Sequence, residues 1–201
     1  TGPHYIVFEG AEACGKSTQA ALLAKRLDAV LTRETGGTAV GARLREILHD
    51  NEVTDLTPRA EALMTAADRA QHIAEIVRPA LDAGRHVVSD RSLYSTLAYQ
   101  GYGRELNVDE VTAINSWAID GTWPQLVIFL EAADELIEQR LADRHLDRFE
   151  AAGDAFHRRV IEGFRVMAAG DPDRWIVIDG NGAIDEVEAT ITAALEERGV
   201  Q

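Results

Sequence analysis

The chain has little cysteine, little lysine and no long apolar run. Its single cysteine, Cys14, excludes an intramolecular disulfide and fits a reducing compartment. No stretch approaches the roughly 20 apolar residues that cross a bilayer, and the first residues do not form a basic-then-apolar signal segment. We therefore expect a cytoplasmic protein with no membrane partner.

The chain also has few basic residues relative to acidic ones. Thirty-four acidic residues face twenty basic ones, for a formal net charge of -14. Binding to nucleic acid polymers or anionic membranes needs a basic surface, so we expect neither partner. The six histidines are scattered without metal-ligand spacing, and we expect no structural metal. With 46% hydrophobic residues, the 201 residues are predicted to fold as a single domain, 1–201.

Five short apolar runs predict the strands of a sheet. Their length and composition are typical of strands that are buried on both faces, and longer stretches with helical spacing separate them. This alternation predicts an α/β fold in which helices cover both faces of a parallel sheet, with ligands bound beyond the carboxyl ends of the strands. The runs are residues 5–8, 29–32, 86–89, 127–130 and 175–178.

A threonine-proline pair at residues 57–58 predicts the start of a helix that continues at least to Glu75. Thr65, Arg69 and His72 fall four and three residues apart along it. Residues with this spacing share one face of a helix. We therefore expect these three side chains to act together.

Glycines mark two further connections. The stretch 101–103, Gly-Tyr-Gly, predicts a turn between helices, and 180–182, Gly-Asn-Gly, predicts a loop after the last strand. Residues 185–198 have the pattern of a closing amphipathic helix.

The most specific motif is the sequence GAEACGKS at residues 10–17, which we call the phosphate loop. Its spacing, G-x-x-x-x-G-K-[ST], follows an apolar run and precedes a helix predicted at 19–27. In such loops backbone N–H groups surround phosphates, the lysine reaches the β- and γ-phosphates, and the hydroxyl holds Mg²⁺. The alternative is a glycine turn with a solvated lysine. We expect ATP to contact Gly10, Ala11, Glu12, Ala13, Cys14, Gly15, Lys16, Ser17 and Thr18.

Two further charged segments are candidates for chemistry. Asp90 and Arg91 end the third apolar run, where a parallel sheet presents side chains to ligands. The structural alternative is that Asp90 caps the next helix and Arg91 pairs with an acidic neighbour. Further on, Arg140, Arg144 and Arg148 recur every four residues. They predict either a cationic lid or a solvated helix face.

In this order, the segments resemble those of bacterial thymidylate kinases, and the resemblance covers nearly the whole chain. It is carried by FEGAEACGKSTQ, TRETGGT, LREIL, AADRAQH, VRPAL, SDRS, LAYQGYGR, LDRFE and FHRRV. The resemblance implies a P-loop NTPase fold with a five-stranded parallel sheet and a short lid at about 141–152. It also implies a homodimer, and transfer of the γ-phosphoryl group of ATP to dTMP to form dTDP in dTTP synthesis, with ATP and Mg²⁺ as cofactors.

The same resemblance assigns roles to individual residues. Because the interior of the phosphate loop has no basic residue, the charge-neutralising arginine is expected in the lid, at Arg148. The implied catalytic residues are Lys16, Arg91, Arg148 and Glu12. The implied substrate-binding residues are Glu12, Arg33, Thr65, Arg69, Arg91, Thr96, Tyr99 and Gln100, and the implied Mg²⁺ ligands are Ser17, Asp90 and Glu150.

Several positions depart from the family's usual residues. Glu12 stands where aspartate is usual, Ala13 where glycine is, and Ser92 where an aromatic residue or histidine is. Thr65 stands where a phenylalanine generally stacks on thymine. Two alternatives therefore stay open: a kinase of another nucleoside monophosphate, and a noncatalytic nucleotide-binding regulator.

Overall fold

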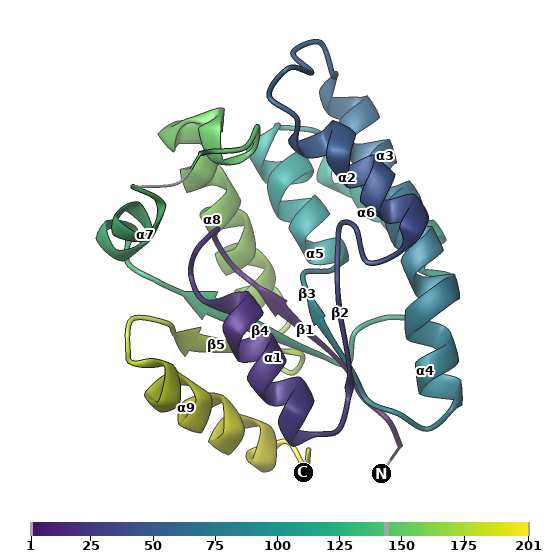
Figure 1. Cartoon of the computed structure of the whole chain (residues 1–201), viewed down its shortest axis with the longest axis vertical. Helices are drawn as coiled ribbons and strands as arrows, with labels where there is room; N and C mark the ends of the chain where they lie inside the picture. Colours follow the sequence, from purple (N-terminus) through teal and green to yellow (C-terminus); the bar gives the residue numbers. More distant parts are fainter. Residues whose placement is uncertain (1, 143–144, 201) are drawn as a thin grey trace.

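A five-stranded, all-parallel sheet forms the centre of the computed structural model, which describes residues 2–142 and 145–200. The strand order is β2-β3-β1-β4-β5, so the strand before the phosphate loop lies in the middle (Figure 1). The strands are β1 (Tyr5–Glu9), β2 (Val30–Arg33), β3 (Val87–Asp90), β4 (Leu126–Glu131) and β5 (Trp175–Asp179).

All five predicted strands are confirmed, but burial on both faces is not general. Strands β1 and β4 are buried almost throughout, whereas β2 alternates between half-buried and exposed residues. Leu31 on β2 is 50% exposed and Val177 on β5 is 53% exposed. The prediction was wrong for these two strands because they form the edges of the sheet, where fewer helices cover them.

Helices cover the two faces as two separate layers. Ile6 and Phe8 of β1 pack with α1 (Lys16–Arg26) and α9 (Ile184–Glu197), while Tyr5 and Val7 point into the opposite layer. This alternation follows from the two-residue period of a strand. The opposite layer contains α3 (Pro58–His72), η1 (Ile73–Val77), α4 (Arg78–Asp82), α5 (Leu93–Thr96), η2 (Leu97–Gly103), α6 (Val108–Ile119) and α8 (Asp154–Gly170).

Three elements surround the carboxyl end of the sheet. Helix α2 (Ala39–His49) lies along α3, and α7 (Asp134–Leu141) and the short η3 (Glu150–Ala152) flank the upper end in Figure 1. Both chain ends lie at the opposite end of the molecule in that view. The carboxyl end of the sheet, where the phosphate loop follows β1, therefore lies away from both chain ends.

The predicted helix starts and ends are largely confirmed. Thr57 caps α3, accepting a hydrogen bond from the backbone N–H of Ala60 at 3.3 Å, and helical structure continues past Glu75 through η1 and α4. The predicted closing helix corresponds to α9, and residues 180–182 form a loop.

The turn predicted at residues 101–103 was wrong, because these residues complete the π-helical segment η2 and the chain turns after Gly103. The glycines serve packing instead. A Cβ atom on Gly103 would lie 2.6 Å from the Phe156 ring, and one on Gly163 would lie 2.6 Å from the Tyr102 ring. Small residues on both segments let η2 and α8 lie in close contact.

Candidate active site

The phosphate loop makes a tight, left-handed path between β1 and α1. Gly10 has φ 142°, and a Cβ atom there would lie 2.5 Å from the Leu130 carbonyl oxygen, so only glycine fits. Ala13 has φ 58°, an unusual value for a residue with a side chain. Helix α1 begins at Lys16. Its N-terminus carries the partial positive charge that favours a bound phosphate.

Lys16 is folded back over the loop. Its ammonium group donates to the Ala11 carbonyl oxygen and lies 3.7 Å from Cys14 Sγ. Cys14 is only 2% exposed. The loop lysine therefore helps to hold the loop shape, and the thiol fills the turn.

Ser17 and Asp90 bring together the oxygen ligands expected for Mg²⁺. The Ser17 hydroxyl, in the first turn of α1, donates to Asp90 Oδ2 at the end of β3. The two elements meet because Asp90 pairs in register with Phe8 of β1, the strand before the phosphate loop. The alternative in which Asp90 caps the following helix is wrong, because Ser92 is the N-cap of α5. A hydroxyl facing a carboxylate is a suitable donor set for a hard cation.

Glu150 lies apart from that pair. Its side chain accepts from the Asp147 backbone N–H at 2.9 Å within the lid turn, and it does not line the cavity described below. Within residues 2–142 and 145–200, no group of three His, Cys, Asp or Glu side chains could hold a metal. A role for Glu150 in metal binding stays a prediction.

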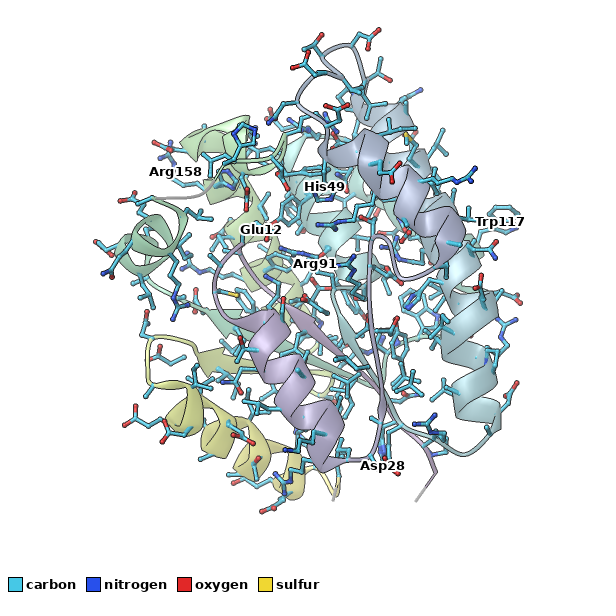
Figure 2. All side chains as sticks on the ribbon, viewed as in Figure 1. Glu12, Asp28, His49, Arg91, Trp117 and Arg158 are labelled. Carbon is cyan, nitrogen blue, oxygen red and sulfur yellow. The ribbon has the colours of Figure 1, made fainter. Side chains whose placement is uncertain are left out.

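Arg91 bridges the phosphate loop and the acceptor side of the site. Its guanidinium donates to Glu12, to the Gly10 carbonyl oxygen at 3.1 Å and to the Tyr99 hydroxyl at 3.2 Å. Figure 2 shows Glu12 and Arg91 side by side at the centre of the molecule. Burial would raise the pKa of Glu12, but the charges of Arg91 and Lys16 lower that pKa to about 2. Glu12 is thus an anion held between two cations.

Glu9 is a functional candidate that the sequence analysis missed. It ends β1, is fully buried, and accepts hydrogen bonds from Ser92 Oγ at 2.7 Å and Ser95 Oγ at 2.6 Å. Burial raises its pKa to about 7, against the opposing effect of Arg91. The signal that could have found it is a carboxylate at the end of an otherwise apolar strand.

Arg69 and His72 share the helix face predicted for them and meet one buried carboxylate. Arg69 Nε donates to Glu34 Oε2 at 2.8 Å, and His72 Nδ1 lies 2.8 Å from Glu34 Oε1. Arg69 also donates to Asn115 Oδ1 and, at 3.0 Å, to the Ser92 carbonyl oxygen. The charge of Arg69 lowers the pKa of Glu34 despite the opposing effect of burial. This network fixes Arg69 rigidly beside the cavity.

One cavity of about 590 Å³ joins the phosphate loop to this acceptor side. Most of the predicted site residues line it, but Gly10, Ala11, Arg148 and Glu150 do not. The predicted residues that line it are Glu12, Ala13, Cys14, Gly15, Lys16, Ser17, Thr18, Arg33, Thr65, Arg69, Asp90, Arg91, Thr96, Tyr99 and Gln100. Residues that line it and were missed include Glu34, Arg45, His49 and Ser95, and Arg140, named only as a lid candidate, lines it too.

The interpretation of the lid arginines as one solvated helix face was wrong, whereas the cationic lid stays a prediction. Helix α7 ends at Leu141, so Arg140 and Arg148 do not share a helix face, and Arg144 lies outside the described residues. Arg148 donates to Glu61 and, at 3.0 Å, to the Leu48 carbonyl oxygen. Arg140 instead donates to the Ala13 carbonyl oxygen at 2.8 Å. Of these two lid arginines, Arg140 is the one at the phosphate loop.

Comparison with known proteins decides the family. A family model described as thymidylate kinase matches residues 8–191. The chain belongs to the thymidylate kinase family. It is 45% identical to the thymidylate kinase of Synechococcus sp. (strain JA-3-3Ab) and 43% identical to that of Bifidobacterium longum (strain NCC 2705). These alignments cover 96% of this chain and 96% and 97% of the two relatives.

A solved thymidylate kinase has the same architecture. The crystal structure of the thymidylate kinase from Ehrlichia chaffeensis superposes with a TM-score of 0.79 at 30% identity, covering 98% of this chain and 99% of that one. The parallel sheet with its phosphate loop is therefore the P-loop NTPase fold that the sequence predicted. None of the helices in the part of the chain that the structure describes is long and apolar enough to cross a membrane.

Arg45 is a cavity residue that the residue assignments left out. It lies in the segment LREIL, which carried part of the resemblance, and its side chain lines the cavity. Burial is the main cause that lowers its pKa; the charges of Arg33 and Arg91 lower it further, whereas those of Glu12 and Asp147 raise it. Three arginines, Arg33, Arg45 and Arg91, thus line one cavity.

Proposed function

We propose that the protein transfers the γ-phosphoryl group of ATP to the 5′-phosphate of dTMP, forming dTDP and ADP for dTTP synthesis in the cytoplasm. One observation carries the proposal: a single cavity joins the phosphate loop to a buried polar surface around Arg69. Donor and acceptor would meet end to end at Arg91, midway between these regions. Membership of the thymidylate kinase family supports the same reaction.

On the donor side, the phosphate loop and the start of α1 bind the ATP phosphates. Lys16 exchanges its bond to the Ala11 carbonyl oxygen for the β- and γ-phosphates. Ser17 and Asp90 would hold Mg²⁺, which would supply positive charge at the phosphates. The work of these residues is alignment, since phosphoryl transfer needs little covalent participation from the protein.

On the acceptor side, Arg33, Arg45 and Arg91 line the cavity and form a site for the dTMP phosphate. A bound dianion would offset the burial and the Arg33 and Arg91 charges that lower the pKa of Arg45. Glu12 holds Arg91 from the opposite side and faces the sugar. Tyr99 supports Arg91 through its hydroxyl and lines the sugar region.

Deoxyribonucleotides are the preferred acceptors. Tyr99 is 7% exposed and packs between the rings of Phe149, Phe156 and Phe164. A ribose 2′-hydroxyl against this ring would lose its water without gaining a partner.

The lid, about residues 141–152, completes the site. Arg140 interacts with the donor phosphates from its position at Ala13. Arg148 neutralises charge during transfer only if it leaves Glu61, so its role requires movement of the lid on substrate binding. Glu150 would contribute to the Mg²⁺ site only if the same movement brought it to the cavity.

A homodimer is part of the proposal. Trp117 on α6 is 84% exposed and Leu63 on the adjoining α3 is 55% exposed. In Figure 2 Trp117 projects from the side of the molecule away from the sheet. Exposed apolar side chains on neighbouring helices are typical of an association surface. Trp117→Ser should yield a monomer by light scattering, whereas Leu31→Ser on the sheet edge should not; an unchanged assembly in both contradicts this interface.

An ADP-release assay across dTMP, dUMP, CMP, UMP, AMP and GMP tests the reaction. We expect dTMP to have the highest kcat/KM, dUMP the second highest, and the ribonucleotides the lowest. A ribonucleotide in first place would identify a kinase of another nucleoside monophosphate. Binding of nucleotides without any ADP release would identify a noncatalytic regulator.

A further inference from the structure

A chain of two hydroxyl groups crosses the acceptor end of the cavity. The Thr65 hydroxyl donates to the Ala62 carbonyl oxygen at 2.8 Å, and the Thr96 hydroxyl donates to Thr65 Oγ1 at 3.1 Å. Both threonines line the cavity and are at most 6% exposed. A carbonyl oxygen can only accept, so the proton of Thr65 is committed to Ala62.

The direction of this chain fixes what Thr96 offers to a ligand. Because Thr65 has already donated its proton, it can bond to Thr96 only as an acceptor. The proton of Thr96 is therefore also committed, and its remaining lone pairs can only accept. Turning that proton toward a ligand would break a buried hydrogen bond, which is costly.

Arg69 supplies a group of opposite character on the same side of the cavity. Its hydrogen bonds to Glu34, Asn115 and the Ser92 carbonyl oxygen use three of its N–H groups among the described residues. Nη2 also lies 2.8 Å from Glu34 Oε2, and the second N–H of Nη1 remains. Asn115 is itself fixed, because its amide nitrogen donates to the Val111 carbonyl oxygen at 2.8 Å. Its oxygen therefore faces Arg69, and Arg69 can only donate.

These two groups are neighbours. Thr65 and Arg69 are four residues apart on α3, and Thr96 lies one helical turn beyond Ser92, whose carbonyl oxygen binds Arg69. The cavity thus presents one fixed acceptor beside one fixed donor. A uracil-type ring offers the complement, with a donor at N3 and an acceptor at O4. A cytosine ring offers the reverse, an acceptor at N3 and a donor amino group.

We infer that Thr65 is a specificity-determining residue: by fixing the hydroxyl of Thr96 as an acceptor, it makes the base site select 4-oxo pyrimidines over 4-amino pyrimidines. This inference rests on the proposed function, which places the acceptor base against these residues. The role of Thr65 in this inference comes from its hydroxyl group and not from the small size of its side chain. A site with buried, fixed polar groups rejects a ligand that leaves them unpaired.

The test compares dUMP with dCMP, which differ only at the N3 and C4 positions that these groups would contact. Dissociation constants of both nucleotides are measured calorimetrically without ATP, so the result does not depend on turnover. The variants are Thr65→Val, which keeps the shape and removes the acceptor, and Thr65→Ser, which keeps the hydroxyl. Thermal unfolding verifies that each variant is folded, and Thr65→Ala replaces Thr65→Val if the latter is not.

We expect the wild type and Thr65→Ser to prefer dUMP, and Thr65→Val to lose about tenfold of that preference, mainly by binding dCMP more tightly. Equal preference in wild type and Thr65→Val, or no preference in the wild type, would overturn the inference. Retained preference in binding together with no phosphorylation of dTMP or dUMP would contradict the proposed function and leave the assignment of Thr65 supported.

Discussion

Arg140 donates a 2.8 Å hydrogen bond to the carbonyl oxygen of Ala13, joining residues that are 127 positions apart. The contact brings a guanidinium to a phosphate loop whose interior has no basic residue. Arg148, in contrast, is held by Glu61, a carboxylate whose side chain is 1% exposed. The two arginines therefore have different partners, one in the phosphate loop and one in the buried acidic cluster at Glu61.

Replacing each arginine should separate the effects of these contacts. Arg140→Ala should reduce kcat/KM for ATP about tenfold, because one charge-assisted contact to phosphate is lost, with little change in the melting temperature.

Arg148→Ala should lower the free energy of unfolding by about 1–3 kcal/mol, since Glu61 loses a buried partner but keeps Gln100 and Arg104. Steady-state kinetics and calorimetry measure both, with the exposed Arg158→Ala as the control for a lost positive charge.

Lys16→Ala should abolish turnover without unfolding the protein. The lysine contacts loop atoms rather than the apolar core, and loss of a phosphate-binding cation typically costs at least about a hundredfold in rate. Lys25, the only other lysine and exposed on the same helix, gives the matched control Lys25→Ala. Turnover in Lys16→Ala close to that of the control would contradict the assignment of the phosphate loop.

Glu9 should make stability fall as pH rises from about 4.5 to about 7. Its pKa in the folded protein is about 7, above the usual 4.5, so the folded state favours the protonated form. The stabilisation is complete below about pH 4.5 and lost by about pH 7, a change of roughly 3 kcal/mol. Glu9→Gln should therefore be more stable than wild type at pH 8 and similar to it at pH 4.5.

Urea unfolding at several pH values measures this difference. Glu12 titrates in a separate window, because its lowered pKa of about 2 gives stability that is present above about pH 4.5 and lost as pH falls toward 2. The exposed Glu197→Gln variant provides the control. A wild-type minus Glu9→Gln difference that is constant between pH 4.5 and 8 would refute the shifted pKa.

Gly41→Ala should destabilise the fold by about 1–3 kcal/mol, although alanine normally favours a helix. A Cβ atom at Gly41 would lie 2.2 Å from Asp68 Oδ1, the atom that accepts from the Gly36 backbone N–H at 2.9 Å. Asp68 is fully buried, so its carboxylate can move only at the expense of neighbouring contacts. Gly101→Ala, whose Cβ atom would lie 3.4 Å from Val108, is the control in a thermal melt; equal stability of the two variants would contradict this packing.

Local patterns predicted the sheet and the phosphate loop because both are encoded by neighbouring residues. Runs of two to five consecutive apolar residues mark the strands, and the spacing from Gly10 to Ser17 defines the loop. The edge positions of β2 and β5 depend on strand order, which no single segment contains.

The rest of the site depends on contacts between distant segments. Arg148 and Arg140 have the same four-residue pattern in sequence, and only the end of α7 at Leu141 separates their environments. Glu9 was missed because its partners, Ser92 and Ser95, come from a helix more than 80 residues away. The pKa of a buried carboxyl depends on the groups packed around it. The sequence of β1 alone does not contain those groups.

The central place of β1 has a consequence for how the chain is made. Ile6 pairs with Val88 on one side and with Leu126 on the other. At roughly 5–20 residues per second, a ribosome synthesises the strand that carries the phosphate loop several seconds before either neighbour exists. During that interval an apolar strand has both edges unpaired, and such contacts between distant residues form slowly. The speed of translation and the supply of chaperones will therefore govern the yield of active protein.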